Sequence, residues 1–364
     1  MRIVIEEDHF LKTMPVILDP ATPAEHCDAV ADFFAHDVPD FPGWRNELRP
    51  RLSGLYPAKV TFAQDQADFD AQLADADGAI VESFLVTEAA LKPAKRLLVV
   101  HKFGGITANI DVAACAARGI AVHAVRRRVN VAVAEQAFAL MIALARRICE
   151  LSGIVEAEGL ARAGYPLRPY DRRYIGNANF ARIPGLRSLA GSTLGIVGLG
   201  EVGREIATRA RAFDMNLLYF QRRALAPNEE TAFGAHYASL EELLRQSDYI
   251  VLQVPLNDST RGMIGRKELA GIRPGAILVN VARAELVDCA ALVEALDSGR
   301  LAGLGLDVGY GEPAKPDDPL LKYKDGKVVL MPHTAVGDRH LALADLEEMC
   351  LNLARGIAGR RSSS

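Results

Sequence analysis

The chain has 364 residues, enough for two domains of ordinary size. Half of the residues are apolar and 24% are charged, a composition typical of a globular protein that buries sizeable cores. The formal net charge of -4 excludes the basic field that nucleic-acid binding requires. We expect a cytoplasmic protein without a membrane partner. The N-terminal residues lack a signal-peptide profile, and no apolar run approaches the roughly 18 residues of a membrane span.

The five cysteines are far apart, and no two of them form a C-x-x-C pair. An odd, scattered set argues against a disulfide framework and against a structural metal site. We expect these cysteines to behave as small buried apolar residues, and we expect no bound metal.

Short runs of Val, Ile and Leu alternate with helical patterns along the chain. The runs are not strictly alternating, which is typical of parallel strands buried on both faces. Helices between such strands imply right-handed crossovers and therefore predict an α/β fold with doubly wound parallel sheets. The predicted strands cover residues 79–81, 97–100, 194–197, 217–220, 250–254, 277–281 and 328–330.

Three segments depart from this alternation of strand and helix patterns. Residues 37–57 contain several prolines and the only tryptophan, Trp44, and predict an irregular surface excursion. Residues 131–148 are apolar nearly all round, which predicts a buried helix between domains or at a subunit contact. Residues 161–189 are rich in Arg, Gly, Pro and Tyr, and we expect them to wrap over the surface.

A glycine motif forms the sharpest local signal, and it reads Gly198-Leu199-Gly200-Glu201-Val202-Gly203. It follows an apolar strand, opens a plausible helix at residues 202–213 and precedes a second strand, so it sits in a βαβ unit. The first glycine permits a tight turn, the second lets backbone approach a pyrophosphate, and the third lets the helix pack close to the strand. Because free N–H groups and a positive dipole end face the ligand there, the motif predicts a dinucleotide site.

The end of the second strand of this unit indicates which dinucleotide binds. Enzymes that use NAD usually have an acidic residue there, which accepts hydrogen bonds from the ribose hydroxyls. This chain has Gln221, followed by Arg222 and Arg223. A neutral amide and two guanidinium groups favour a 2′-phosphate, so we expect NADP to be preferred, with NAD as the alternative. The arginines could also be a solvated pair.

Reduction of a 2-oxo acid needs a cation for the carboxylate, a proton donor for the ketone oxygen and a group that holds that donor. Three predicted strand ends in the C-terminal half supply these residue types. Arg283 follows an apolar strand, Glu312 follows a second one, and His333 ends a third. Open α/β sheets bind ligands at such carboxyl ends, so we expect the three side chains to form the catalytic set.

Four ordered motifs carry a family resemblance: the glycine motif, Asn280 to Asp288, Leu306 to Pro313, and Pro332 to Ala335. With these segments the chain resembles the D-isomer-specific 2-hydroxyacid dehydrogenases over roughly residues 75 to 358. The resemblance implies a nicotinamide-dependent oxidoreductase acting on a small 2-oxo or 2-hydroxy acid.

The resemblance also assigns roles to single residues. It implies that Arg283 binds the substrate, that His333 is the general acid and base, and that Glu312 orients the histidine. Asp307 matches an aspartate that touches the nicotinamide carboxamide. Further implied cofactor contacts are Val254, Pro255, Thr260, Val281 and Ala282, with the glycine-motif residues Glu201 and Val202.

The family layout implies two domains with a cleft between them. Residues 1–126 with 336–364 would form a flavodoxin-like substrate domain, and residues 127–335 would form the dinucleotide-binding domain. The apolar helix at 131–148 suggests a homodimer.

The sequence departs from the family pattern near the expected substrate loop, Gly104, Gly105 and Ile106. A β-branched residue stands where a second glycine often sits, so the loop geometry is expected to differ. The run Arg126-Arg127-Arg128 is either a solvated charge run or places one arginine where it selects the acid. A carboxylate at Glu82 would disfavour a phosphorylated substrate.

A non-enzymatic alternative is a corepressor-like regulator of the same fold, which senses the dinucleotide without turnover. Relatives of that kind can carry a complete catalytic set, so the three residues alone do not exclude it.

Overall fold

The computed structural model describes residues 1–323 and 326–361, with no side-chain description beyond residue 359. The chain forms two compact units. Unit 1 comprises Met1–Asn130 and Val336–Ser364, and unit 2 comprises Val131–Ala335. The chain therefore first passes from unit 1 to unit 2 after Asn130, whereas the sequence predicted a boundary after residue 126. The prediction of two α/β units with parallel sheets is confirmed.

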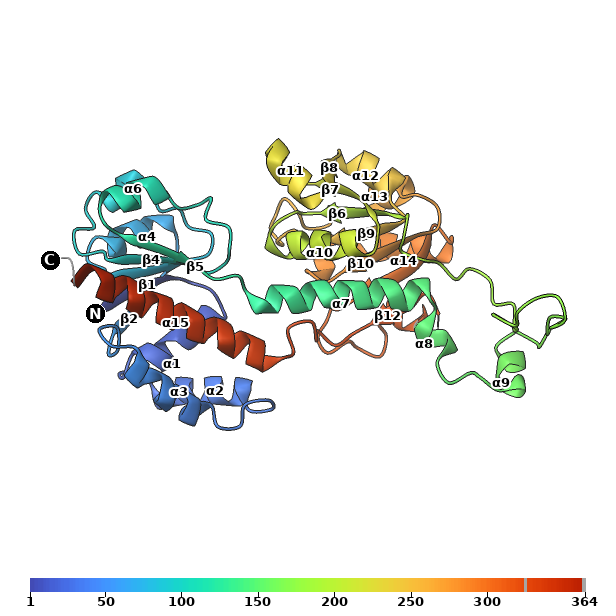
Figure 1. Ribbon diagram of the computed structural model, residues 1–364, viewed down its shortest axis with the longest axis horizontal. Coiled ribbons are helices and arrows are strands. Elements are labelled where there is room, and N and C mark those ends of the chain that lie inside the picture. The colour runs from blue at the N-terminus through green and yellow to red at the C-terminus, as the bar shows by residue number, and fades with distance from the viewer. Residues whose placement is uncertain (324–325, 362–364) are drawn as a thin grey trace. The chain divides into compact units, whose positions relative to one another are not determined.

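Unit 1 is built on a five-stranded sheet, and each pair of neighbouring strands is parallel (Figure 1). The strand order is β2-β1-β3-β4-β5, which is the flavodoxin-like order. Helix α15 (Arg339–Arg361) packs on β4 and β5. The strands are β1 (Arg2–Glu6), β2 (Lys59–Ala63), β3 (Gly78–Val81), β4 (Val99–Lys102) and β5 (Ala121–Ala124). The other helices are α1 (Met14–Leu18), α2 (Ala24–Phe34), α3 (Phe41–Leu48), α4 (Gln66–Leu73), α5 (Glu88–Leu91) and α6 (Val112–Ala117), with 3₁₀ turns η1 (Leu11–Thr13) and η2 (Arg49–Arg51).

The proline-rich stretch 37–57 is only partly irregular, because residues 41–51 form helical structure, so that prediction is wrong in part. It contains α3, whose N-cap Asp40 accepts a hydrogen bond from the Gly43 N–H at 2.8 Å. Proline is tolerated in the first helical turn because the N–H it lacks has no partner there. Phe41 is 1% exposed and stacks on Phe34 with ring centroids 4.8 Å apart. The segment therefore covers the unit 1 core rather than leaving it.

Unit 2 is built on a seven-stranded parallel sheet. Its order, β12-β11-β10-β9-β6-β7-β8, reverses direction between β6 and β9, as in dinucleotide-binding sheets. The strands are β6 (Thr193–Val197), β7 (Asn216–Phe220), β8 (Ala235–Tyr237), β9 (Tyr249–Leu252), β10 (Ala276–Asn280), β11 (Leu301–Leu306) and β12 (Val328–Leu330). The helices are α8 (Ile148–Leu151), α9 (Ala157–Arg162), α10 (Glu201–Ala212), α11 (Pro227–Phe233), α12 (Leu240–Gln246), α13 (Arg266–Gly271) and α14 (Cys289–Asp297), with 3₁₀ turns η3 (Ala284–Leu286) and η4 (Pro319–Tyr323).

Helix α7 (Arg128–Ala145) lies against the unit 2 sheet. A Cβ added at Gly305 of β11 would come 2.9 Å from Leu140, so the bare glycine lets the helix approach closely. The helix has the length and composition of a membrane span, a test that core helices also pass, and half of it is buried in the structure. Positions such as Glu135 are exposed in the single chain, so the expected burial on every side would require a subunit contact, which stays a prediction.

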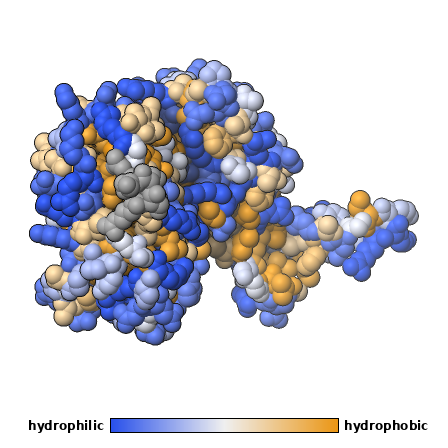
Figure 2. Space-filling model, turned by 60° about the vertical axis from the view of Figure 1, so that its left-hand side comes forward, coloured by the Kyte–Doolittle hydropathy of each residue, from blue (hydrophilic) through white to orange (hydrophobic). Residues whose placement is uncertain are grey.

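The segment 161–189 is mostly exposed and irregular, and it projects from unit 2 instead of wrapping over it (Figure 1). Arg147 contacts this segment near both of its ends. Its guanidinium contacts the Tyr165 hydroxyl and donates to the Pro184 carbonyl at 3.1 Å. Figure 2 shows apolar and polar residues side by side on this projection. The segment is therefore a defined arm with fixed ends, although it has little regular structure.

Candidate active site

The glycine motif forms the turn between β6 and α10, as the sequence predicts. Gly198 has a φ of +102°, a value that a residue with a side chain rarely adopts. A Cβ at Gly203 would lie 2.2 Å from the Gly198 carbonyl oxygen, so only glycine lets the helix start this close to the strand. A Cβ at Gly200 would meet nothing within 4 Å, which leaves space beside the backbone for a ligand.

The N-terminus of α10 faces this space. Gly200 is the N-cap, and no side chain caps the helix there. Glu201 and Val202 occupy the first turn and are both partly exposed. Beside the motif, Nε2 of Gln253 is buried and has no hydrogen-bond partner among the described residues. An open glycine turn, an uncapped helix N-terminus and an unpaired amide fit the phosphates and amide of a dinucleotide.

The other expected cofactor contacts follow the neighbouring strands β9 and β10. Val254 and Pro255 lie just beyond β9, which ends at Leu252, two residues earlier than the sequence suggests. Thr260 donates to the Pro255 carbonyl at 2.7 Å and so closes this loop. Val281 and Ala282 follow β10, and Ala282 is partly exposed. These residues share one edge of the sheet with the glycine motif.

The residues predicted to select between NADP and NAD follow β7 at the same edge of the sheet. The Gln221 side-chain amide donates to the Arg223 carbonyl at 2.7 Å, which fixes the turn. Arg222 and Arg223 are exposed, and the described part of the chain gives their guanidinium groups no partner. Two unpaired cations therefore stand at the end of the second strand of the βαβ unit.

Arg283 lies in a turn that follows β10. Hydrogen bonds of the Asn280 side chain stabilise this turn. Asn280 is fully buried; its amide donates to the Arg283 carbonyl at 2.7 Å and accepts from the Ala282 N–H at 3.0 Å. The Arg283 side chain is exposed, and its Nη1 donates to the Ala282 carbonyl at 2.7 Å. Ala284, which replaces a glycine of the family pattern, has no positive φ and fits the turn.

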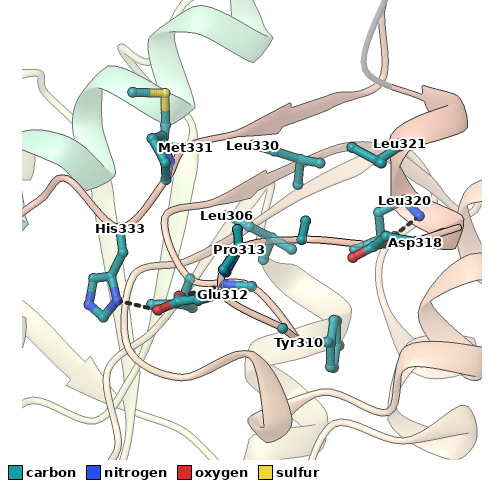
Figure 3. Close-up of a pocket in the computed structure, with 15 residues that line it drawn as sticks. Leu306, Tyr310, Glu312, Pro313, Asp318, Leu320, Leu321, Leu330, Met331 and His333 are labelled. Atoms are coloured by element: carbon teal, nitrogen blue, oxygen red, sulfur yellow. Dashed lines mark hydrogen bonds and ion pairs between the residues drawn. The ribbon is translucent and has the colours of Figure 1, made fainter. Parts of the chain in front are cut away.

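Glu312 and His333 form a pair beyond the ends of β11 and β12 (Figure 3). Nδ1 of His333 lies 3.0 Å from Oε2 of Glu312, and Oε1 accepts the Gly309 N–H at 3.0 Å. The Gly309 N–H and the histidine hold the pKa of the Glu312 carboxyl below its usual value, with a smaller contribution from Arg283. The carboxylate thus stays ionised and occupies one ring nitrogen, which leaves Nε2 for other chemistry.

A cavity of about 430 Å³ adjoins this pair. In Figure 3 its walls come from the strand ends and the loop that carries Glu312, and they are mainly apolar. The labelled apolar residues are Leu306, Tyr310, Pro313, Leu320, Leu321, Leu330 and Met331. An apolar wall lowers the local dielectric and strengthens the hydrogen bond between the two side chains.

His333 has a left-handed backbone, with a φ of 53°. Such a value is uncommon outside glycine and costs energy that the surroundings must supply. Asp307 is part of those surroundings. It is fully buried, and its carboxylate accepts the N–H groups of Thr334 at 3.0 Å and Ala335 at 2.9 Å. Gln136 of α7 donates to the same carboxylate at 3.1 Å. Asp307 therefore holds the backbone that presents His333, while its nicotinamide contact stays a prediction.

The expected substrate loop lies in unit 1, after β4. Gly104 has the positive φ, 145°, whereas Ile106 does not, so the isoleucine is compatible with the loop. The Val125 N–H donates to the Gly104 carbonyl at 3.1 Å, and a Cβ at Gly105 would lie 4.0 Å from Cα of Arg126. The loop therefore runs alongside the segment that opens the arginine run.

The three arginines of that run have different surroundings. Arg126 is exposed. Arg128 is paired with Asp345 at 2.9 Å and with Glu348 of α15 at 2.7 Å. Arg127 lies 4.0 Å over the Phe103 ring. The interpretation as a uniform solvated charge run is therefore wrong.

No cluster of three or more His, Cys, Asp or Glu side chains is arranged to hold a metal within residues 1–323 and 326–359. The cysteines are all free thiols, and their exposure ranges from buried Cys115 and Cys350 to exposed Cys149. The expectation that all five are buried is therefore wrong.

Comparisons with known proteins identify the family of the chain. Residues 138–335 match the model of the D-isomer specific 2-hydroxyacid dehydrogenase NAD-binding domain. A glyoxylate reductase of Thermococcus litoralis is 38% identical over 248 residues, 68% of this chain and 70% of the relative. One from Aeropyrum pernix is 35% identical over 300 residues, 80% of this chain and 84% of the relative. A solved glyoxylate reductase from Paecilomyes thermophila matches with a TM-score of 0.54 and 32% identity, covering 86% and 92% of the two chains.

The strand order of unit 2, its glycine turn and the matched domain define the class: an oxidoreductase with a nicotinamide dinucleotide-binding domain. The chain belongs to the D-isomer specific 2-hydroxyacid dehydrogenase family.

Sequence reasoning missed residues that position the site rather than form it. Asn280 and Gln136 are the clearest, because each donates a hydrogen bond to a predicted site residue, Arg283 and Asp307 respectively. Asn280 stands inside the motif Asn280 to Asp288, so its position in the sequence is a usable signal. Gln136 gave none, since it lies on a helix far from the site in sequence.

Proposed function

We propose that the chain reduces a small 2-oxo acid to a D-2-hydroxy acid and catalyses the reverse oxidation. The observation that carries this proposal is the 3.0 Å contact between Nδ1 of His333 and Glu312, beside the turn that presents Arg283. A proton donor, its carboxylate partner and a cation for an acid follow three adjacent strands of a dinucleotide-type sheet.

His333 is the general acid and base in this proposal. Glu312 stabilises the imidazolium and fixes the ring, so Nε2 gives its proton to the ketone oxygen and takes it back from the alcohol. An imidazole suits both roles because it titrates at roughly pH 6.5 in the absence of perturbation. The apolar cavity wall beside the pair keeps competing water away.

Arg283 binds the substrate carboxylate. Its planar guanidinium can donate two parallel hydrogen bonds and keeps its charge at any working pH. Gly104, Gly105 and Ile106 are proposed as further substrate-binding residues.

The glycine turn and the N-terminus of α10 would hold the cofactor phosphates, with Val254, Pro255, Thr260 and Ala282 along the same edge. When bound, the reduced nicotinamide supplies the hydride. We propose that NADP is preferred over NAD, because Arg222 and Arg223 are exposed at the position expected to meet the adenosine ribose and have no acidic partner among the described residues. Replacing both by alanine should raise the KM for NADPH while the KM for NADH changes little. Equal effects on both would contradict the preference.

The reaction is tested by following the oxidation of NADPH and NADH with glyoxylate, pyruvate and hydroxypyruvate. Turnover of at least one acid supports the proposal. A regulator that only senses the dinucleotide would bind the cofactor, seen by fluorescence titration, and oxidise it with none of the acids. No observation on the site favours that second function.

We also propose a homodimer. The support is the arm described above, which is rich in arginine on a chain of net negative charge and exposes large apolar side chains. Among the described residues, those from α8 to the arm are Ile148, Val155, Leu167, Tyr174, Ile175 and Phe180. Light scattering after gel filtration should give twice the chain mass, and Tyr174→Ser with Ile175→Ser should lower it. A monomeric wild type would contradict the proposal.

A further inference from the structure

Unit 1 has an open hollow of about 410 Å³ on its surface, and no residue assigned to the proposed reaction lines it. Its walls come from residues 46–56, which run from the end of α3 through η2 into the turn that follows. Leu52 is its buried apolar part, and the partly buried Arg49 is its charged part. The 46–56 hollow therefore belongs to unit 1 alone and is separate from the candidate active site.

The Arg49 guanidinium is held in a fixed position at the wall of this hollow. Its Nε donates to the Ile17 carbonyl at 2.9 Å and its Nη2 donates to the Val16 carbonyl at 3.1 Å. These carbonyls belong to the last turn of α1, where a cation is favourable. The Tyr56 ring lies against the guanidinium, with its centroid 4.7 Å from Cζ. Within the described residues Nη1 has no hydrogen-bond partner, so one donor nitrogen of a rigid cation is left for a ligand.

The positive charge at this place is not neutralised by the protein. Arg45 lies four residues before Arg49 in continuous helical structure, so the two side chains are neighbours on one face. Nε of Arg45 is buried without a hydrogen-bond partner among the described residues. Burial lowers the pKa of the Arg49 guanidinium, and the charge of Arg45 lowers it further. Only Tyr56 and Cys27 act in the opposite sense, and neither arginine forms an ion pair in the described part of the chain.

Neutral hydrogen-bond donors stand at the rim of the 46–56 hollow. The Asn46 amide and the Ser53 hydroxyl both line it and are exposed, and within the described residues neither side chain makes a hydrogen bond. The turn that carries Ser53 is closed by the Leu55 N–H, which donates to the Leu52 carbonyl at 3.0 Å. A positive φ of 81° at Gly54 suits this turn, because glycine adopts such a value without strain. The hollow thus combines unpaired positive charge with free N–H and O–H groups.

We propose that the 46–56 hollow binds a phosphate group, carried either by inorganic phosphate or by a small phosphate monoester. Such a group has a charge of about -1.5 to -2 at neutral pH, which balances the two guanidinium groups. Its oxygens accept the charge-assisted hydrogen bonds that arginine donates, and the hydroxyl and amide at the rim can donate to the others. Buried polar groups are normally paired, and a bound phosphate would supply the missing partner. The site does not depend on the proposed reaction.

Isothermal titration calorimetry on the full chain tests the site, with the ionic strength held constant by sodium chloride so that screening does not change. The probes are inorganic phosphate, O-phosphoserine as a monoester, and acetate as an anion with a single charge. We expect inorganic phosphate to bind about tenfold or more tightly than acetate. Tighter binding of O-phosphoserine assigns the site to a monoester, and weaker or equal binding assigns it to free phosphate.

Substitutions locate the binding. Arg49→Met should weaken phosphate binding by about tenfold or more, and Arg45→Met should weaken it by about threefold or more. The matched control is Arg51→Met, because Arg51 lies in the same segment but is already paired with Glu347 at 2.7 Å. That variant should bind phosphate as the wild type does.

The predicted cofactor site could also take a phosphate, so it needs its own control. The double variant Arg222→Ala with Arg223→Ala should leave the binding measured here unchanged. Where Arg49→Met does not fold, because its contacts with α1 are lost, Arg45→Met with Ser53→Ala carries the same comparison.

The proposal is overturned if the folded wild type does not bind phosphate or binds acetate equally well. It is also overturned if the Arg51 variant loses as much affinity as the Arg49 variant, or if only the double variant loses binding. None of these outcomes affects the proposed reaction, which the turnover of 2-oxo acids tests separately.

Discussion

Nδ1 of His333 lies 3.0 Å from Oε2 of Glu312, and the second oxygen of that carboxylate accepts the Gly309 N–H. The carboxylate is therefore held from both sides, and one ring nitrogen of the histidine is committed to it. Everything proposed for proton transfer depends on this contact.

Glu312→Gln should lower kcat by roughly 10²-fold or more, because an amide cannot stabilise the imidazolium. The same substitution tests whether the folded protein lowers the pKa of the Glu312 carboxyl. The folded pKa of Glu312 is depressed, so its contribution to stability is present above about pH 4.5, the ordinary value, and is lost as the pH falls through the folded pKa. Because both side chains are more than a third exposed, we expect at most about 1 kcal/mol.

Thermal unfolding of both forms at pH 7 and below pH 4 measures that contribution. A difference that grows on acidification would contradict the assigned direction. Wild-type turnover by Glu312→Gln would contradict the role of the pair.

Arg283→Ala should weaken substrate binding and turnover together. A charged hydrogen bond contributes about 1.5–3 kcal/mol, so kcat/KM should fall by roughly 10–100-fold or more. Arg283→Lys should recover little of this, because an ammonium cannot replace the two-pronged guanidinium. Steady-state kinetics with a fixed cofactor concentration check both variants. An unchanged KM and kcat in the alanine variant would remove Arg283 from the site.

Asp307→Asn should destabilise the fold as well as the site. The buried carboxylate accepts several N–H groups, and an amide would turn a donor toward them. The expected loss in unfolding free energy is about 1–3 kcal/mol, read from urea denaturation. Asp317→Asn is the control, since that side chain is exposed. Equal stability of the two variants would show that Asp307 does not hold the His333 backbone.

Gly200→Ala should separate cofactor binding from folding. The added Cβ meets no protein atom within 4 Å, so the unfolding free energy should stay close to wild type. It would instead enter the space proposed for the phosphates and weaken dinucleotide binding by about tenfold or more. Gly271→Ala, equally open, is the control for an added methyl. Fluorescence titration with NADPH that gives wild-type affinity would place the phosphates elsewhere.

The sequence predicted the parts of the molecule that obey local rules. Buried strands such as 277–281 and 328–330 read as apolar runs, and the glycine motif between a strand and a helix predicted the turn that the structure has there. Strand β4 was placed too early, since it continues into the polar residues His101 and Lys102, which are buried. Such burial depends on tertiary partners that a local pattern does not contain.

Other features needed the tertiary structure for the same reason. Prolines at residues 39–57 suggested a loop, yet apolar contacts such as Phe41 on Phe34 determine the helix there. The three arginines at 126–128 read as one charge run, and only the fold separates the Phe103 partner of Arg127 from the acidic partners of Arg128.

The central claim is that His333 moves the proton in a cofactor-dependent reduction of a 2-oxo acid. The most direct measurement is the rate of NADPH oxidation with hydroxypyruvate by the wild type and by His333→Ala, each shown to be folded and to bind the cofactor. We expect turnover by the wild type and a loss of about 10²–10⁴-fold in the variant, with cofactor affinity retained. Equal rates for the two proteins would contradict the account.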